Sequence, residues 1–442
     1  MILIAMTSLD SDTFIVSPGG RLRGRLRVPG DKSISHRAIM LGALAEGTTT
    51  ITGFLEGEDS LATLAAFKAM GVQIDGPHRG KVIIQGVGLH GLRQPDHALD
   101  LGNSGTSMRL LSGLMAGQAF DVVLTGDASL SSRPMSRVID PLSSMGAKIK
   151  ADTDGTAPLH IQGGQSLKAM DYTLPMASAQ VKSSVLLAGL YTQGKTCVTE
   201  PAPTRDHTER MLSGFGYDVE HNDMTVCVKG GGELTATNID VPADISSAAF
   251  FMVGASIAPG SDVTLEHAGV NPTRSGIIDI LQLMGADIEL LNEQDVSGEP
   301  VADIRVRSSQ LHGVDIPSAL VPLAIDEFPA IFVAAACADG ETHLTGAAEL
   351  RVKESDRLQV MAEGLTSLGI ETQLQHDGIS IQGGTLQGGE VDSHGDHRIA
   401  MAMAMAGLVA AGPVTVTQCT NVSTSFPDFI SLARTAGLGI QA

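Results

Sequence analysis

The sequence predicts a mixed α/β fold (α+β) in which six similar units, each β-α-β-α-β-β, follow one another along the chain. Three observations support this prediction: a helical segment that ends at a Gly recurs six times, a second and more apolar helix recurs beside it, and a short β-rich stretch follows each apolar helix. Self-similarity at a nearly constant period marks a repeat architecture, in which each repeat is one supersecondary unit. The 442 residues are also too many for one ordinary core, so we expect two domains.

The first recurring feature is a helical segment followed by Gly and a strand, as in LAAFKAMGVQI (64–74) and IDPLSSMGAKI (139–149). Its marker glycines stand 68 to 84 residues apart and are Gly71, Gly146, Gly216, Gly285, Gly369 and Gly437. The residue directly after a helix often needs a positive φ, which Gly adopts without steric cost. We therefore predict that each marker Gly follows the last turn of a helix.

The second recurring feature is a helix that is apolar around nearly its whole circumference, which indicates burial on all sides. The six segments are 33–47, 106–118, 178–194, 245–260, 328–340 and 397–412. The loops before them are rich in Gly, Ser, Asp and His, residues that cap helices or form exposed turns. If the units are alike, the six helix N-termini occupy equivalent positions, and grouped around a cleft they would attract phosphate and carboxylate groups.

Charge and composition exclude several classes of partner. The formal net charge of −20 argues against nucleic acid, because duplex binding depends on neutralising phosphates. A small anionic substrate is still compatible, since basic residues cluster at 21–37 and 351–357. The four Cys lie far apart and the 13 His form no HxxxH or HxH pair, so we expect neither a disulfide framework nor a metal site.

No segment is predicted to enter a membrane or to direct export. The longest apolar run, 399–411, has 13 residues, whereas a membrane span needs about 20. Residues 1–12 lack the basic region and the long apolar stretch of a signal peptide. We therefore expect a cytoplasmic protein.

Eight motifs in the predicted loops carry a resemblance to a known enzyme family. They are GDKSISHR (30–37), LGNSGTSMR (101–109), SSRPM (131–135), SAQVKS (178–183), DEFP (326–329), RVKESDRL (351–358), GDHRIAMA (395–402) and TSFPDF (424–429). In this order, and over essentially the whole chain, they resemble the 5-enolpyruvylshikimate-3-phosphate synthase family, and its second class in particular. The resemblance implies a two-domain inside-out α/β barrel of the enolpyruvyl transferase type, with three units per domain. The domains would be 1–28 with 245–442 and 29–244, with hinge crossings near 28–31 and 242–245 and a cleft that closes on substrate.

The resemblance also implies a reaction. The enolpyruvyl group of phosphoenolpyruvate would move to the 5-hydroxyl of shikimate-3-phosphate by addition and elimination, with release of phosphate. Residues that match the family's phosphoenolpyruvate site are Lys32, Asn103, Gly105, Arg133, Gln180, Arg357, His397 and Arg398. Residues that match its shikimate-3-phosphate site are Lys32, Ser33, Arg37, Ser178, Ala179, Gln180, Arg205, Asp326 and Lys353.

Three residues are expected to act in the chemistry. Asp326 would accept the hydroxyl proton, Glu354 would protonate the methylene carbon, and Lys32 would contact both substrates. The resemblance implies no cofactor, no metal and only small-molecule partners. It also implies a monomer that acts in the pathway to aromatic amino acids.

Three positions depart from the commoner family pattern. Ala179 replaces a Ser and Leu110 replaces a Pro. Thr424 replaces a Lys, which leaves more of the phosphoenolpyruvate binding to Arg357 and Arg398. Some second-class members resist the herbicide glyphosate, in part through a bulkier residue at the position where this chain keeps Gly105. Sensitivity to this inhibitor therefore stays open.

Structural interpretations compete with the functional ones. Asp206 and His207 are expected to cap a helix, and the Arg residues at positions 21, 23, 25 and 27 to form one solvated or salt-bridged face of a strand. Considered alone, Asp326 would be a helix cap and Glu354 a surface acid.

Two other functions also stay open. The sister enzyme that acts on UDP-N-acetylglucosamine shares the repeats, but its first Lys is followed by Asn where this chain has Ser33, and it presents a Cys where this chain has none before Cys197. A non-catalytic anion-binding protein of the same fold would need neither Asp326 nor Glu354.

Overall fold

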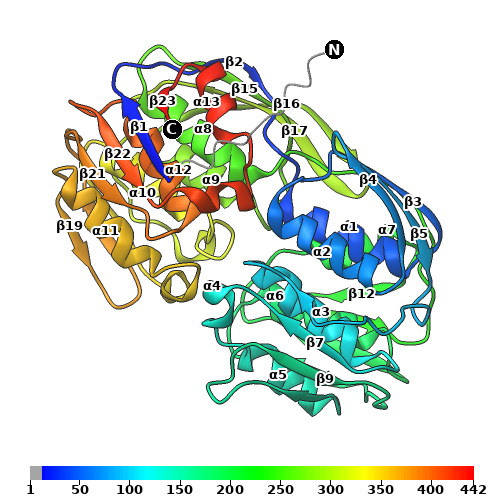
Figure 1. Ribbon diagram of the computed structural model, residues 1–442. Helices are drawn as coiled ribbons and strands as arrows, with labels where there is room; N and C mark the ends of the chain where they lie inside the picture. Colours follow the sequence, from blue (N-terminus) through cyan, green and yellow to red (C-terminus); the bar gives the residue numbers. More distant parts are fainter. Residues whose placement is uncertain (1–11) are drawn as a thin grey trace.

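The computed structural model describes residues 12–442 and contains two packed bodies (Figure 1). Buried hydrophobic side chains form a first core from residues 14–28 and 243–440, and a second core from residues 34–241. In Figure 1 most elements of the first core occupy the upper part of the view, and those of the second core the lower right. The expectation that the opening segment is no signal peptide concerns residues 1–11, which lie outside the described residues.

Three four-stranded sheets surround the second core, in the orders β14-β3-β5-β4, β6-β7-β9-β8 and β10-β11-β13-β12. Their strands are β3 (Glu46–Thr52), β4 (Gln73–His78), β5 (Lys81–Val87), β6 (Leu99–Asp100), β7 (Val122–Thr125), β8 (Lys148–Lys150), β9 (Leu159–Gln162), β10 (Asp171–Thr173), β11 (Lys195–Thr199), β12 (Val219–Asn222), β13 (Thr225–Lys229) and β14 (Asn238–Asp240). The helices here are α1 (Lys32–Leu44), α2 (Glu58–Ala69), α3 (Gly105–Ala116), α4 (Ala128–Ser131), α5 (Ser136–Ser144), α6 (Ala179–Gly189) and α7 (His207–Gly214). Helices α1, α3 and α6 are mostly buried, and α3 packs against the other two.

Two four-stranded sheets and one three-stranded sheet surround the first core, in the orders β16-β17-β15-β2, β21-β22-β1-β23 and β18-β20-β19. Their strands are β1 (Thr13–Ser17), β2 (Arg23–Leu26), β15 (Asp262–Gly269), β16 (Asp287–Val296), β17 (Glu299–Arg307), β18 (Glu341–Leu344), β19 (Thr372–Leu374), β20 (Ile379–Gln382), β21 (Gly389–Asp392), β22 (Val414–Thr417) and β23 (Gly439–Gln441). The helices are α8 (Ile245–Ile257), α9 (Gly276–Leu283), α10 (Phe328–Ala336), α11 (Arg357–Ser367), α12 (His397–Ala406), α13 (Phe429–Ala436), and the short 3₁₀ helices η1 (Ser318–Leu320), η2 (Ala348–Val352) and η3 (Thr420–Thr424). Helices α8, α10 and α12 pack on one another inside.

The strand order confirms the six predicted units and their inside-out arrangement. In the five four-stranded sheets the first strand of a unit pairs in parallel with the second, and the fourth lies between the second and third. In the sheet β18-β20-β19, the bridge between Asp315 and His343 stands where the first strand would lie. The sequence pattern did not show that β14, β2 and β1 pair with strands that lie far away in the chain, namely β3, β15 and β22. Pairing over such distances depends on tertiary packing, which a local pattern does not encode.

The marker glycines confirm their predicted place at the ends of helices. All six have positive φ, from 77° at Gly216 to 113° at Gly437. After α2, for example, Gly71 has φ 89° and its N–H donates to Lys68 O at 3.0 Å. The left-handed backbone turns the chain from each of these helices into the strand that follows.

The chain passes between the two cores twice, and the crossings lie against each other. Asp31 N donates to Pro242 O at 2.8 Å, and Asp244 N donates to Pro29 O at 2.9 Å. A Cβ at Gly30 would lie 1.9 Å from the backbone oxygen of Gly53, so the first crossing needs Gly where it passes the end of β3. Helices α1 and α8 therefore start directly after two crossings that are hydrogen-bonded to each other.

The structure corrects the expectation that the cysteines form no disulfide. Cys197 in β11 and Cys227 in β13 are bonded, although 30 residues separate them in the sequence. They are direct partners in the antiparallel ladder, and Cys197 N points away from β13 to donate to Met170 O. Side chains approach closely at such non-hydrogen-bonded pairs. Spacing alone did not reveal the pair, because strand register is a tertiary property.

Candidate active site

Five of the six inner helices begin at a polar side chain that accepts a backbone N–H of the first turn. These residues are Asp31 for α1, Ser104 for α3, Ser178 for α6, Asp244 for α8 and Asp396 for α12. The side chain before α10 makes no such capping bond. The loops thus act as predicted for five helices, and each helix start carries about half a positive charge.

Asp326, two residues before the start of α10, is surrounded by cations from both bodies. Arg205, from the loop before α7, forms an ion pair with Asp326 Oδ2, and Lys353 Nζ and Arg357 Nη1 each lie 3.4 Å from Oδ1. Arg398 Nη1 donates to the backbone oxygen of Asp326 at 3.2 Å. Burial raises the pKa of Asp326, but these four cations outweigh burial and hold the pKa well below its ordinary range. Asp326 is therefore ionised at neutral pH.

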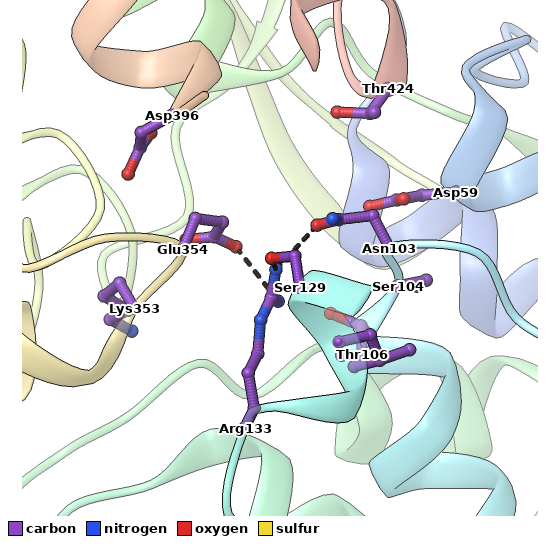
Figure 2. Close-up of polar contacts among 12 residues, drawn as sticks. Asp59, Asn103, Ser104, Thr106, Ser129, Arg133, Lys353, Glu354, Asp396 and Thr424 are labelled. Atoms are coloured by element: carbon purple, nitrogen blue, oxygen red, sulfur yellow. Dashed lines mark hydrogen bonds and ion pairs between the residues drawn. The ribbon is translucent and has the colours of Figure 1, made fainter. Parts of the chain in front are cut away.

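Glu354 forms ion pairs with arginines from both bodies. Its Oε2 lies 2.6 Å from Arg357 Nη2, and its Oε1 lies 3.6 Å from Arg133 Nη1. Figure 2 shows Arg133 reaching from the α4 side toward Glu354, with Asp396 and Thr424 opposite. Burial raises the pKa of Glu354, but the charges of Arg357 and Arg133, with a smaller contribution from His397, outweigh burial. The net pKa of Glu354 therefore lies well below its ordinary value.

Arg357, at the start of α11, ties this cluster to α12. Its Nε donates to Asp396 Oδ2 at 2.8 Å, and its side chain is 1% exposed. Asp396 in turn caps the helix that begins with His397 and Arg398. Two predicted site segments, RVKESDRL and GDHRIAMA, therefore meet at one buried guanidinium.

The loop before α3 supports Arg133. Asn103 Oδ1 accepts from Arg133 Nη2 at 2.6 Å (Figure 2). Asn103 Nδ2 donates to Asp127 Oδ2 at 2.8 Å, which fixes the orientation of the amide. Gly105 leaves room beside the guanidinium groups. A Cβ there would lie 2.8 Å from Arg109 Nη1 and 3.2 Å from Arg133 Nη1.

Gln180 connects the start of α6 with the start of α3. Its Oε1 accepts from Arg109 Nη1 at 2.8 Å, and its Nε2 donates to Thr106 Oγ1 at 3.0 Å. Helix α6 begins at Ala179 behind the cap Ser178, so the small Ala leaves the first backbone N–H groups uncovered by a large side chain.

Lys32 is the first residue of α1 and contacts residues of both bodies. Its Nζ forms an ion pair with Asp59 in the first turn of α2, and its backbone N–H donates to Asp244 Oδ2 at 3.2 Å. Burial and then the charge of Lys32 lower the pKa of His397 to about 3. His397 is therefore neutral at physiological pH and stands within the field of Lys32.

Arg37 lies one turn further along α1 and is held from three sides. Its Nη1 donates to Ser33 O at 3.0 Å, its Nη2 to Ser183 Oγ at 2.8 Å, and its Nε to Thr208 Oγ1 at 2.6 Å. Burial lowers the pKa of Arg37 to about 10, so the guanidinium keeps its charge at neutral pH.

Sequence reasoning missed three side chains that shape this site. Asp59 pairs with Lys32, Arg109 binds Gln180, and Asp396 binds Arg357. Arg109 and Asp396 stand inside the recognised motifs LGNSGTSMR and GDHRIAMA, so the motifs could have pointed to them. Asp59 has no such signal, because its sequence context EGEDS is an ordinary helix start.

The structure also corrects the expectation for Asp206 and His207. Helix α7 begins at His207, but the Asp206 side chain makes no capping bond. Instead, Asn271 Nδ2 donates to Asp206 Oδ1 at 2.6 Å, and His207 Nδ1 lies 2.7 Å from Glu299 Oε1. Both residues therefore connect the two bodies.

Within residues 12–442, no group of three or more His, Cys, Asp or Glu is arranged to hold a metal ion. In the same residues, no helix combines the length and apolarity needed to cross a membrane.

Comparison with known proteins identifies the family. The sequence profile of the family described as EPSP synthase (3-phosphoshikimate 1-carboxyvinyltransferase) matches residues 16–432. A 3-phosphoshikimate 1-carboxyvinyltransferase of Alkalilimnicola ehrlichii is 70% identical over 97% of this chain and 96% of its own, and one of Nitrosococcus oceani is 68% identical over 99% of both. A solved structure of EPSP synthase from Acinetobacter baumannii has a TM-score of 0.88 and 58% identity, covering 98% of this chain and 99% of its own. The resemblance noted in the sequence is thereby confirmed, and the chain belongs to the EPSP synthase (3-phosphoshikimate 1-carboxyvinyltransferase) family of enzymes.

Proposed function

We propose that the chain transfers the enolpyruvyl group of phosphoenolpyruvate to the 5-hydroxyl of shikimate-3-phosphate and releases phosphate. Family membership supports the reaction. The observation that carries the assignment of residues is the convergence of Arg133, Arg357 and Arg398 on Asp326 and Glu354. Several cations in one partly buried site suit two multiply charged anions, and arginine binds carboxylate or phosphate with two donors.

The two substrates share Lys32 and Gln180 in this proposal, and each has further contacts of its own. Phosphoenolpyruvate binds Arg133, Arg357 and Arg398 together with Lys32, and Gly105 lets it approach the backbone. Its remaining neighbours are Asn103, Gln180 and His397. Shikimate-3-phosphate binds at the starts of α1 and α6 and beside the cations around Asp326. Its contacts are Lys32, Ser33, Arg37, Ser178, Ala179, Gln180, Arg205, Asp326 and Lys353.

Asp326 and Glu354 move the protons. Asp326 accepts the proton of the attacking hydroxyl as oxygen adds to C2 of phosphoenolpyruvate, and Glu354 delivers a proton to C3. Loss of a proton from C3 then expels phosphate and restores the double bond. When substrate anions take over Arg205, Lys353 and the other cations, Asp326 loses the charges that lower its pKa and becomes a stronger base. Preorganised cations supply the remaining stabilisation of the charge that develops.

Three further features belong to the same proposal. The domain division 1–28 with 245–442 against 29–244 is supported by the two separate hydrophobic cores. A monomer is supported by the fact that both walls of the site come from this one chain. A cytoplasmic location rests on the sequence, and cell fractionation tests it.

A coupled phosphate-release assay tests the proposed function. Phosphate is expected from phosphoenolpyruvate with shikimate-3-phosphate and not from phosphoenolpyruvate with UDP-N-acetylglucosamine. Release with the nucleotide sugar alone would favour the sister enzyme. No phosphate release with either acceptor, while phosphoenolpyruvate and shikimate-3-phosphate still bind, would favour a non-catalytic anion-binding protein.

A further inference from the structure

Arg274 is a buried arginine, 3% exposed, that the proposed reaction does not use. It stands between β15 and α9, and its guanidinium contacts both chain crossings. Nη1 donates to Asp31 Oδ2 at 3.2 Å, and Nη2 donates to Asp244 Oδ1 at 3.1 Å. Because Asp31 caps α1 and Asp244 caps α8, a single side chain holds the first turn of one inner helix from each body.

The same guanidinium reaches the start of a third inner helix. Arg274 Nη2 donates to Ser246 Oγ at 2.6 Å, and the Ser246 hydroxyl donates to Glu327 Oε1. Nη2 itself lies 3.9 Å from Glu327 Oε1. Glu327 precedes α10 and directly follows Asp326, so this contact ends beside the proposed base.

The residues that Arg274 holds are the chain neighbours of the reacting groups. Asp31 directly precedes Lys32, and Asp244 also accepts the backbone N–H of Lys32 at 3.2 Å. Lys32 and Asp326 belong to different bodies, yet each is one residue away from a carboxylate in the Arg274 cluster.

Asp31 and Arg274 form an ionised pair in this buried cluster. Burial raises the pKa of Asp31, but Arg274, His207 and the backbone N–H of Ile34 together outweigh burial, so its net pKa lies below the ordinary value. Burial lowers the pKa of Arg274, whereas Asp31, Asp244 and Glu327 raise it above its already high ordinary value. Removing one partner from such a group leaves buried charge without compensation, which is strongly unfavourable.

We propose that Arg274 is a positioning residue that sets the separation of Lys32 and Asp326 across the cleft, an inference that rests on the function proposed above. Arg274 touches no reacting atom and acts through Asp31, Asp244 and Glu327. A displacement of about 1 Å caused far from the chemistry can cost roughly 10²-fold in rate.

Arg274→Gln tests this role, because it removes the charge and keeps a long polar side chain. We expect kcat/KM to fall roughly 10²-fold per folded molecule. Arg274→Lys should recover part of the loss, since an ammonium keeps the charge but cannot span the same partners. The matched control is Ile381→Ala in β20, a buried site (1% exposed) away from the cluster, which should lower the melting temperature and leave kcat/KM unchanged. A folded Arg274→Gln variant with wild-type kcat/KM overturns the proposal.

Ser246→Ala keeps the test decisive if Arg274→Gln does not fold. It removes only the hydroxyl between Arg274 and Glu327, and the loss of one such hydrogen bond should lower kcat/KM about fivefold. Wild-type kcat/KM in this mild variant also overturns the proposal.

Small-angle scattering separates the two proposals, because it needs no turnover. Free Arg274→Gln, or Ser246→Ala in its place, should have a larger radius of gyration than the wild-type chain, whereas Ile381→Ala should not. A wild-type chain that releases no phosphate contradicts the proposed function alone. An unchanged radius of gyration in the folded variant contradicts the role of Arg274 alone.

Discussion

Gly105→Ala should weaken phosphoenolpyruvate binding much more than binding of the other substrate. The new Cβ would lie 2.8 Å from Arg109 Nη1, about 0.6 Å closer than ordinary van der Waals contact begins, and 3.2 Å from Arg133 Nη1. Neither guanidinium is free to move, because Gln180 holds the first and Asn103 the second. Burial lowers the pKa of Arg109 to about 10, so its guanidinium still carries a charge at neutral pH.

The size of this effect follows from the cost of overpacking. Forcing an extra methyl group into a filled site costs about 1–3 kcal/mol. If the cost falls on Arg133 and the phosphoenolpyruvate site, KM for phosphoenolpyruvate should rise about 10- to 100-fold, since about 1.4 kcal/mol is a factor of ten.

Steady-state phosphate release, with each substrate varied in turn, measures this change. KM for shikimate-3-phosphate should change much less, because among its proposed contacts only Gln180 touches a guanidinium that the new Cβ would meet. Gly384→Ala is the control, since a Cβ there meets nothing closer than Ile370 Cδ1 at 3.5 Å. An unchanged KM for phosphoenolpyruvate in Gly105→Ala would refute the packing argument.

Three other perturbations have defined outcomes. Asp326→Asn should lower kcat by roughly 10²-fold while calorimetry still detects substrate binding. The control is Asp315→Asn, which should have wild-type kcat because the Asp315 side chain is 89% exposed. Wild-type kcat in Asp326→Asn would exclude Asp326 as the base. The pKa values of Asp326 and Glu354 are lower in the folded chain than in the unfolded chain. Their contribution to the free energy of unfolding is therefore complete above about pH 4 and is lost as the pH falls through the folded pKa values. A melting temperature that did not fall between about pH 4 and pH 2 would contradict this direction of the pH dependence. Reduction of Cys197–Cys227, which closes a loop of 30 residues, should lower the free energy of unfolding by about 3–4 kcal/mol; thiol titration of the denatured chain should rise from two groups to four on reduction, and equal stability of both forms would count against the loop-closure estimate.

The fold was largely predictable from the sequence, because its repeats express local rules. Gly71 and its five counterparts mark helix ends through backbone conformation alone, and Ser104 or Asp396 mark helix starts through capping. These signals depend on neighbours within a few residues. They therefore remain readable without knowledge of tertiary contacts.

The site was predictable only in part. The motifs led to Arg133, Glu354 and Arg357, which the structure brings together. No local pattern shows that Asp59 faces Lys32, because that pairing depends on how α1 packs against α2. The role of Arg274 is hidden for the same reason, since its partners come from both crossings.

The position of β2 has a consequence for synthesis on the ribosome. Leu22, at the entrance to this strand, donates its N–H to Ser261, 239 residues later. At about 5–20 residues per second, the segment emerges and waits roughly 12 to 48 s before β15 exists to pair with it. Arg23 and Arg25 keep the waiting segment charged, and charged side chains oppose edge-to-edge aggregation of unpaired strands. In the finished protein Arg25 meets Glu266 at 2.5 Å, so a residue that protects the nascent chain ends as part of a surface ion pair.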